Sequence, residues 1–108
     1  MQKLEIDQTK STPFVNLNPD TGLLEIGGES YPENSKEFFD PVLEWIEQFL
    51  SSEDTAVTLR VTLSYMNTSS TKYIIEILDR LEQANEKGRP VTIEWYCDGD
   101  NDRELDTV

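Results

Sequence analysis

The chain has 108 residues with 22 acidic and 9 basic side chains, which gives a formal net charge of −13. A chain of this length forms one domain, and its negative charge argues against binding to nucleic acid or to anionic membranes. Because it contains no histidine and Cys97 is its one cysteine, we expect no histidine-dependent catalysis, His/Cys zinc site or internal disulfide. The sequence also has no Gly-rich phosphate-binding loop, and no bound cofactor is expected.

A small antiparallel β region is predicted for the first third of the chain. Residues 3–6 alternate polar and apolar side chains, and residues 13–17 can form a second extended segment. Residues 18–22 read Asn-Pro-Asp-Thr-Gly, a strong turn signal, and residues 23–26 then form the returning strand of a hairpin. The pair Gly27-Gly28 is expected to end that strand.

The first helix is predicted over residues 35–50, capped by Asn34 or Ser35. Its apolar side chains recur at helical spacing: Phe38, Val42, Trp45, Ile46 and Phe49. Pro41 interrupts this pattern, because a proline inside a helix removes one hydrogen bond and crowds the preceding turn. We expect a bend near Pro41; the alternative is that Asp40 caps a helix beginning at Pro41.

Two strands with strict alternation follow. Residues 56–65 have one apolar side: Val57, Leu59, Val61, Leu63 and Tyr65. Residues 91–96 repeat this alternation with Val91, Ile93 and Trp95. A strand buried on both faces would be apolar nearly throughout, so we expect one covered face and one face at least partly in contact with water.

A strong helical pattern lies between these two strands. Its predicted buried stripe is Ile74, Ile77, Leu78, Leu81 and Ala84. A strand, a helix and a strand in this order indicate parallel strands joined by a right-handed β-α-β crossover. The predicted fold class is therefore α/β, a two-layer domain of residues 1–97 with a mixed sheet and its helices mainly on one face. Residues 98–108 are predicted to form a disordered acidic tail.

Five consecutive small polar residues stand where the clearest strand passes into this helix: Asn67, Thr68, Ser69, Ser70 and Thr71. One interpretation is structural, because Asn, Ser and Thr cap helices by accepting hydrogen bonds from free N–H groups. The other is a phosphoacceptor hydroxyl, because those N–H groups and the helix dipole favour a phosphate there. One cap suffices, so five candidates exceed the structural need, but the residues alone leave both interpretations open.

Several segments resemble the SiaC family of bacterial regulatory phosphoproteins, which are relatives in shape of the STAS domain. The longest is LSYMNTSSTKYIIEILDRLEQA at residues 63–84, and SYPENS occupies residues 30–35. Shorter matches are STP at 11–13, WIEQFL at 45–50 and GRPVTIEWY at 88–96. The resemblance covers residues 10–98 and implies a STAS-like regulatory domain.

The resemblance implies a partner-switching protein and not an enzyme. In such families a dedicated Ser/Thr kinase phosphorylates a residue at the strand-to-helix junction, and a PP2C-type phosphatase removes the phosphate. The unmodified form binds a client, which in the SiaC system is a diguanylate cyclase that it activates. The residue that matches the family's phosphothreonine is Thr68, and the helix start around it comprises Asn67, Ser69, Ser70 and Lys72.

A partner-binding surface is predicted where residues 30–34 join the Thr68 junction, with Tyr31, Pro32, Glu33 and Asn34 as its members. The competing interpretation is that Tyr31 packs on the core and Pro32 shapes a turn. A second hypothesis for the whole chain is a small acidic structural or scaffold subunit without a phosphorylation switch.

The expected location is the cytoplasm, without membrane insertion. The N-terminus lacks the basic start and apolar run of a signal peptide, and no apolar run approaches the ~20 residues that span a bilayer. A lone cysteine fits a reducing compartment.

Overall fold

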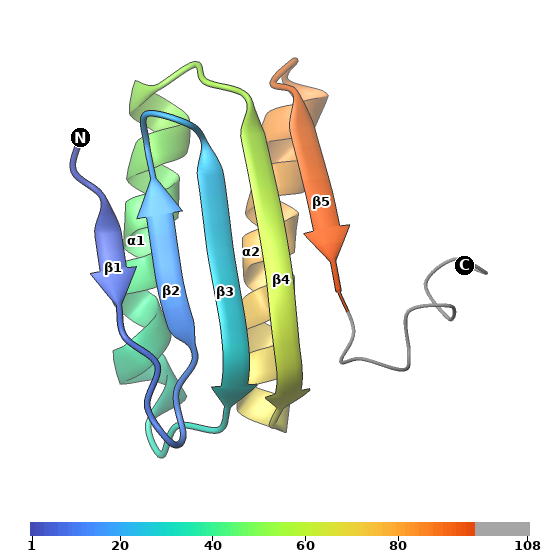
Figure 1. Cartoon of the computed structure of the whole chain (residues 1–108). Coiled ribbons are helices and arrows are strands. Elements are labelled where there is room, and N and C mark those ends of the chain that lie inside the picture. Colours follow the sequence, from blue (N-terminus) through green and yellow to red (C-terminus); the bar gives the residue numbers. More distant parts are fainter. Residues whose placement is uncertain (97–108) are drawn as a thin grey trace.

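The computed structural model describes residues 1–96 and shows a five-stranded mixed sheet with two helices on one face (Figure 1). The strands lie across the sheet in chain order. The elements are β1 (Leu4–Ile6), β2 (Phe14–Asn18), β3 (Leu23–Ser30), α1 (Ser35–Ser52), β4 (Val57–Met66), α2 (Thr68–Glu86) and β5 (Val91–Trp95). The predicted two-layer α/β architecture is confirmed, whereas the predicted tail, residues 98–108, lies outside the described residues.

Antiparallel pairing joins β1 to β2 and β2 to β3, as expected for the predicted hairpin. Parallel pairing joins β3 to β4 and β4 to β5, with α1 and α2 as the connections. Both helices lie behind the same face of the sheet in Figure 1, and both crossovers are right-handed. Because β3 and β4 are parallel, the helices that follow them, α1 and α2, begin at the same end of the sheet.

The hydrophobic core lies between the sheet and the two helices. Because side chains alternate along each strand, one face of the sheet lies toward the helices. From this face, β4 contributes four core residues: Val57, Leu59, Val61 and Leu63. The helices contribute Phe39, Val42, Leu43, Ile46 and Phe49 from α1, and Ile74, Ile77 and Leu81 from α2. Of the predicted apolar positions, six are only partly buried: Phe38, Trp45, Leu78, Ala84, Val91 and Trp95. Ile93, predicted on the covered side of its strand, is exposed, because β5 is the edge strand of the sheet.

The first helix runs without interruption from Ser35 to Ser52, with Pro41 inside it. Asn34 is the N-cap, because its side-chain Oδ1 accepts a hydrogen bond from the backbone N–H of Glu37 at 3.1 Å. The alternative in which Asp40 caps a helix beginning at Pro41 is therefore wrong. Pro41 is exposed, so water can reach the carbonyl group that the missing N–H leaves without its helical partner.

The glycine pair does not end β3, contrary to expectation, because the strand continues through it to Ser30. Gly27 instead allows close packing: a Cβ there would lie 2.1 Å from the Thr62 hydroxyl oxygen and 2.5 Å from the Phe14 ring. The absence of a side chain lets the Phe14 ring cover the strand. Gly27 therefore serves the contact between β2, β3 and β4.

Tyr65 does not face the core, although the alternation in β4 predicts that it does. The β3–β4 register shifts so that Leu63 pairs with Gly28 but Tyr65 pairs with Glu29, which leaves Ser64 as an extra residue. Such a bulge reverses which side chains face inward beyond it. Met66 consequently packs against the core, while Tyr65 is 53% exposed.

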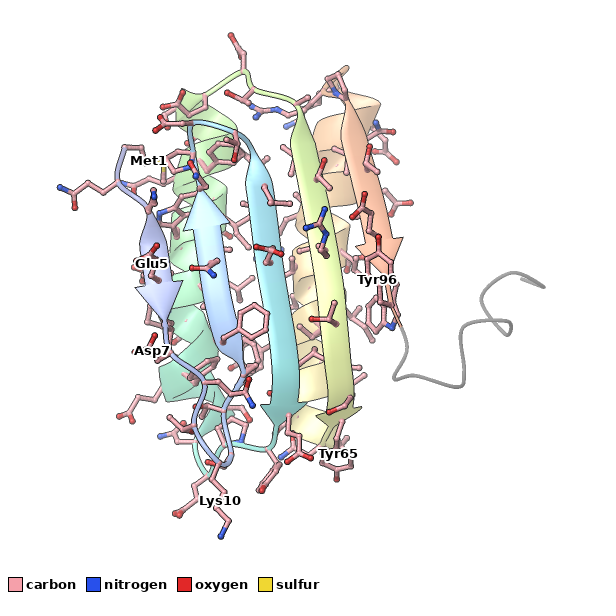
Figure 2. All side chains as sticks on the ribbon, viewed as in Figure 1. Met1, Glu5, Asp7, Lys10, Tyr65 and Tyr96 are labelled. Atoms are coloured by element: carbon pink, nitrogen blue, oxygen red, sulfur yellow. The ribbon has the colours of Figure 1, made fainter. Side chains whose placement is uncertain are left out.

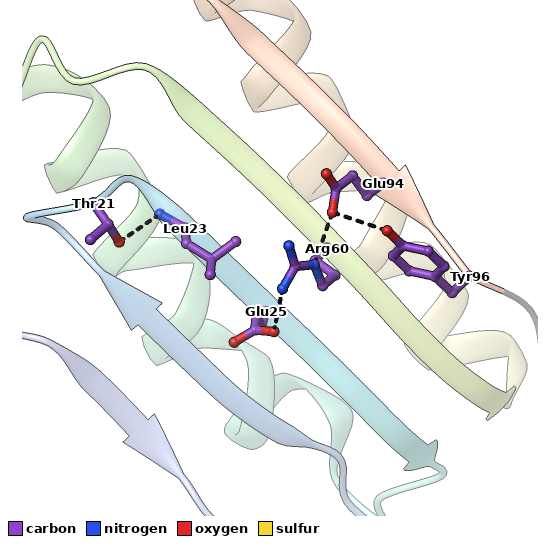
Figure 3. Close-up of polar contacts among 6 residues, drawn as sticks. All are labelled: Thr21, Leu23, Glu25, Arg60, Glu94 and Tyr96. Atoms are coloured by element: carbon purple, nitrogen blue, oxygen red, sulfur yellow. Dashed lines mark hydrogen bonds and ion pairs between the residues drawn. The ribbon is translucent and has the colours of Figure 1, made fainter.

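The face of the sheet opposite the helices carries charged side chains in register across three strands. Arg60 of β4 donates to Glu94 of β5 at 2.8 Å and to Glu25 of β3 at 3.2 Å (Figure 3). The hydrogen bond that Arg60 donates to Glu94 is the main cause that raises the pKa of its guanidinium above the ordinary value. Burial opposes this rise in the pKa, and the hydrogen bond donated to Glu25 adds to it. The predicted exposed sheet face is thus confirmed, and it is charged where the three parallel strands meet.

Candidate functional site

The candidate site lies at the carboxyl ends of β3 and β4, where both helices begin. β3 ends at Ser30 shortly before α1 starts at Ser35, and β4 ends at Met66 shortly before α2 starts at Thr68. Figure 1 shows these two helix starts together at the lower edge of the sheet. In α/β sheets, sites form at the carboxyl ends of parallel strands because helix N-termini and connecting segments meet there.

Asn67 holds the junction between β4 and α2. Its Oδ1 accepts hydrogen bonds from the N–H of Ser70 at 2.9 Å and from the Ser69 hydroxyl at 3.2 Å. Its own N–H donates to the carbonyl of Ser30 at 2.9 Å, and its carbonyl accepts from the Thr71 hydroxyl at 3.1 Å. The capping interpretation therefore holds for Asn67, which leaves the function of the following hydroxyl groups to be explained separately.

Two pairs of serine hydroxyl groups connect the two helix starts. Ser30 and Ser70 lie 2.7 Å apart, oxygen to oxygen, and both side chains are fully buried. Ser35, the first residue of α1, and Ser69 lie 2.6 Å apart in the same way. The structure thus brings residues 30–35 and the Thr68 junction together, as predicted, through pairs of residues that are 40 and 34 positions apart.

Thr68 differs from the residues that follow it. It is the first residue of α2 and is exposed. Among residues 1–96 its hydroxyl group makes no hydrogen bond, whereas the hydroxyl groups of Ser69, Ser70 and Thr71 are all bonded. Of the candidate acceptors, Thr68 is therefore the one whose oxygen is available to an incoming reagent.

The charge around the start of α2 suits an added anion. No acidic residue lies in its first turn, and Lys72 is exposed one turn after Thr68. Lys36 in the first turn of α1 is already paired with Asp40 at 2.6 Å, and this hydrogen bond raises the pKa of the Lys36 ammonium above its ordinary value. The positive end of the α2 dipole is thus not neutralised by a first-turn carboxylate.

An exposed aromatic pair borders the junction. The rings of Tyr31 and Tyr65 meet edge to face with centroids 5.9 Å apart, and the two side chains are 37% and 53% exposed. Figure 2 shows Tyr65 at the end of β4 where α2 begins. Tyr31 therefore packs on another surface tyrosine and not in the core, and the bulge at Ser64 is what places its partner there.

The other predicted partner-surface residues have mixed positions. Glu33 is exposed, Pro32 is buried, and the Asn34 side chain is occupied in capping α1. Tyr65 was not among the predicted members, because regular alternation assigns it to the core. The spacing of the apolar residues around it contains no signal for a one-residue bulge.

These features define a class: a small two-layer domain in which an exposed hydroxyl group at a helix start lies beside an exposed aromatic pair. The accessible hydroxyl group is the feature that control by covalent modification requires. The chain belongs to the SiaC family of regulatory phosphoproteins, whose family model matches residues 6–108. Within residues 1–96, no helix is both long enough and apolar enough to cross a bilayer.

Relatives of known structure come from Pseudomonas aeruginosa. The chain is similar to apo-SiaC, with 44% sequence identity and a TM-score of 0.90 over 97% of this chain and 87% of the other. A chain in the crystal structure of diguanylate cyclase SiaD in complex with its activator SiaC matches with 42% identity and a TM-score of 0.88, over 96% and 85% of the two chains. An uncharacterized protein of strain UCBPP-PA14 is 44% identical over 103 residues, which are 95% of this chain and 82% of that protein.

Proposed function

We propose that this protein is a partner switch in which phosphorylation of Thr68 controls binding to a diguanylate cyclase. The unphosphorylated form binds this client and activates it, as the complex of SiaD with its activator SiaC supports. The observation that carries the proposal is the available hydroxyl of Thr68 at the start of α2. The protein then acts on cyclic di-GMP signalling by binding, without catalysis of its own.

The client-binding surface comprises the Tyr31–Tyr65 pair together with Glu33 and the segment that Pro32 and Asn34 shape. Tyrosine is enriched at the energetically dominant positions of interfaces, because its rigid ring buries a large area and its hydroxyl can still find a partner. The contacts between residues 30–35 and the α2 start place this aromatic pair and Thr68 at one end of the sheet. A modification of Thr68 therefore changes the surface that the client contacts.

Phosphorylation works here by charge and not by refolding. A Ser/Thr kinase adds a phosphate with about −1.5 to −2 charge, and a PP2C-type phosphatase removes it. The free N–H groups and the dipole of α2 accept this charge, so the stability of the domain changes by at most about 1 kcal/mol. A client surface that must desolvate or face the new charge loses several kcal/mol of binding, which is the difference that a switch needs.

The test is phosphorylation of the full chain by the Ser/Thr kinase, followed by peptide mapping and by titration with the cyclase. We expect one phosphate on Thr68, loss of binding upon phosphorylation, and only trace incorporation into Thr68→Ala. Thr92→Ala, which alters an exposed threonine of β5 outside the junction, is the matched control and is expected to be modified normally. Unchanged cyclase binding by the fully phosphorylated chain would contradict the switch, and absence of any phosphorylation would favour the scaffold hypothesis.

A further inference from the structure

The run of hydroxyl groups at the start of α2 poses a problem of selectivity. Thr68, Ser69, Ser70 and Thr71 are consecutive, so a kinase that reaches Thr68 also comes within one residue of Ser69. Ser69 is itself an exposed residue, so burial does not exclude it as Ser70 is excluded. Something other than exposure must therefore distinguish the oxygen of Thr68 from that of Ser69.

The hydrogen bonds supply that distinction. The Ser69 hydroxyl donates its proton to Asn67 Oδ1 at 3.2 Å, so Ser35 is left as the donor in the 2.6 Å contact between Ser35 and Ser69. The Ser69 oxygen is thus occupied as both donor and acceptor. The Thr68 oxygen has no such partner within residues 1–96.

The hydrogen bonds of a hydroxyl oxygen affect how readily it can accept a phosphoryl group. In the reaction, a bond forms between the hydroxyl oxygen and the γ-phosphorus of a nucleoside triphosphate, and the bond from that phosphorus to the β,γ-bridging oxygen breaks. The hydroxyl proton passes to a base of the kinase, so the oxygen must present a lone pair to phosphorus and its proton to that base. An oxygen that accepts from Ser35 and donates to Asn67 must first give up both contacts.

We propose that Ser35 is a specificity-determining residue, whose hydroxyl group, by binding Ser69, restricts phosphorylation to Thr68. This inference rests on the proposed function, because it presupposes that a kinase modifies this junction. Ser30 holds Ser70 in the corresponding way, but both of these side chains are fully buried. Loss of Ser30 leaves Ser70 inaccessible, whereas loss of Ser35 leaves Ser69 exposed and held by one longer contact only.

The experiment uses full-length variants in a Thr68→Ala background, with the kinase that phosphorylates the wild-type chain and with ATP. Addition of Ser35→Ala is expected to raise the rate of phosphorylation at Ser69 at least about fivefold above that in Thr68→Ala alone. This factor corresponds to the free energy of about one ordinary hydrogen bond. Addition of Ser30→Ala, the matched control, is expected to produce none. A further Ser69→Ala substitution in the first double variant is expected to abolish the new phosphate.

The outcomes separate the two proposals. If the wild-type chain is phosphorylated at Thr68 but the double variant with Ser35→Ala stays unmodified, the role of Ser35 is wrong and the switch stands. If the wild-type chain is not modified at Thr68, the proposed function itself fails. Circular dichroism verifies that each variant is folded, and Ser35→Cys, which keeps the size but bonds only weakly, provides a second test of the same contact.

Discussion

The two ends of the sheet hold the helices by different means. At the carboxyl ends of β3 and β4, the groups that connect the helix starts within residues 1–96 are neutral: the pairs Ser30–Ser70 and Ser35–Ser69 and the cap Asn67. At the opposite end, a charged group holds the end of α1. The guanidinium of Arg89 donates to the carbonyl groups of Leu50, Glu53 and Thr55 and lies 5.6 Å from the centre of the Phe49 ring.

This difference indicates that the end of the sheet at Arg89 acts as a structural anchor, whereas the end at Thr68 can accept a modification. A cation at a helix C-terminus neutralises the negative end of the dipole, and hydrogen bonds from a charged donor are roughly twice as strong as neutral ones. The start of α2 has neutral partners and no carboxylate in its first turn, so a phosphate there displaces no native ion pair. We therefore expect the Arg89 end to determine stability and the Thr68 end to determine binding.

The largest expected effect on stability belongs to Arg89. Arg89→Ala leaves the carbonyl groups at the end of α1 without their charged donor and uncovers Phe49, so the free energy of unfolding is expected to fall by about 2–4 kcal/mol. Urea denaturation measures this loss. Arg89→Lys keeps the charge but not the fork of donors and is expected to recover only part of it. A loss below about 1 kcal/mol in Arg89→Ala would show that this end is not the anchor.

A large effect on binding with little effect on stability is expected for Tyr65. Tyr65→Ala removes half of the exposed aromatic pair, and a residue that dominates an interface costs about 2 kcal/mol or more, which is about 30-fold in Kd for the cyclase. Isothermal titration with the unphosphorylated chain measures it. Tyr96, which is 47% exposed and also labelled in Figure 2, provides the matched control. Equal losses from Tyr65→Ala and Tyr96→Ala would mean that the aromatic pair is not the binding surface.

A smaller effect is expected for the cap of α2. Asn67→Ala leaves the N–H of Ser70 and the hydroxyl of Ser69 without their common acceptor, and loss of such a cap costs about 1 kcal/mol. Asn34→Ala at the start of α1 is the matched control, with a similar expected loss. Thermal unfolding of the two variants compares them. Because only Asn67 also orders the hydroxyl run, Asn67→Ala alone is expected to slow phosphorylation of Thr68.

The fold was predictable wherever a local pattern decides it. Alternation in β4 and helical spacing in α2 identify both elements and their buried sides, because burial of one face controls each pattern. Five adjacent polar residues likewise drew attention to the junction between β4 and α2, but Thr68 was singled out among them only by the resemblance to the SiaC family. Tyr65 was assigned to the wrong face, because a single extra residue at Ser64 reverses the alternation and leaves no local trace.

Contacts between distant segments could not be predicted in the same way. The serines at positions 30 and 35 are ordinary residues in a short connecting segment, and only the folded chain brings them to Ser70 and Ser69. The role of Arg89 is equally hidden, because the carbonyl groups that it binds belong to backbone 34 to 39 residues earlier. The candidate acceptor was therefore accessible to sequence reasoning, but the contacts that distinguish it from its neighbours were not.

The smallest effect is expected for Thr68 itself, and it completes the comparison between anchor and switch. Thr68→Ala removes an exposed hydroxyl group without a partner in the described chain, so the free energy of unfolding is expected to change by less than about 0.5 kcal/mol. Ser70→Ala, two residues away, leaves the buried Ser30 hydroxyl group unpaired and is expected to cost about 1–3 kcal/mol. Urea denaturation of both variants decides the point. A loss above about 1 kcal/mol in Thr68→Ala would mean that this side chain supports the helix start, and its hydroxyl group would then not be freely available for phosphorylation.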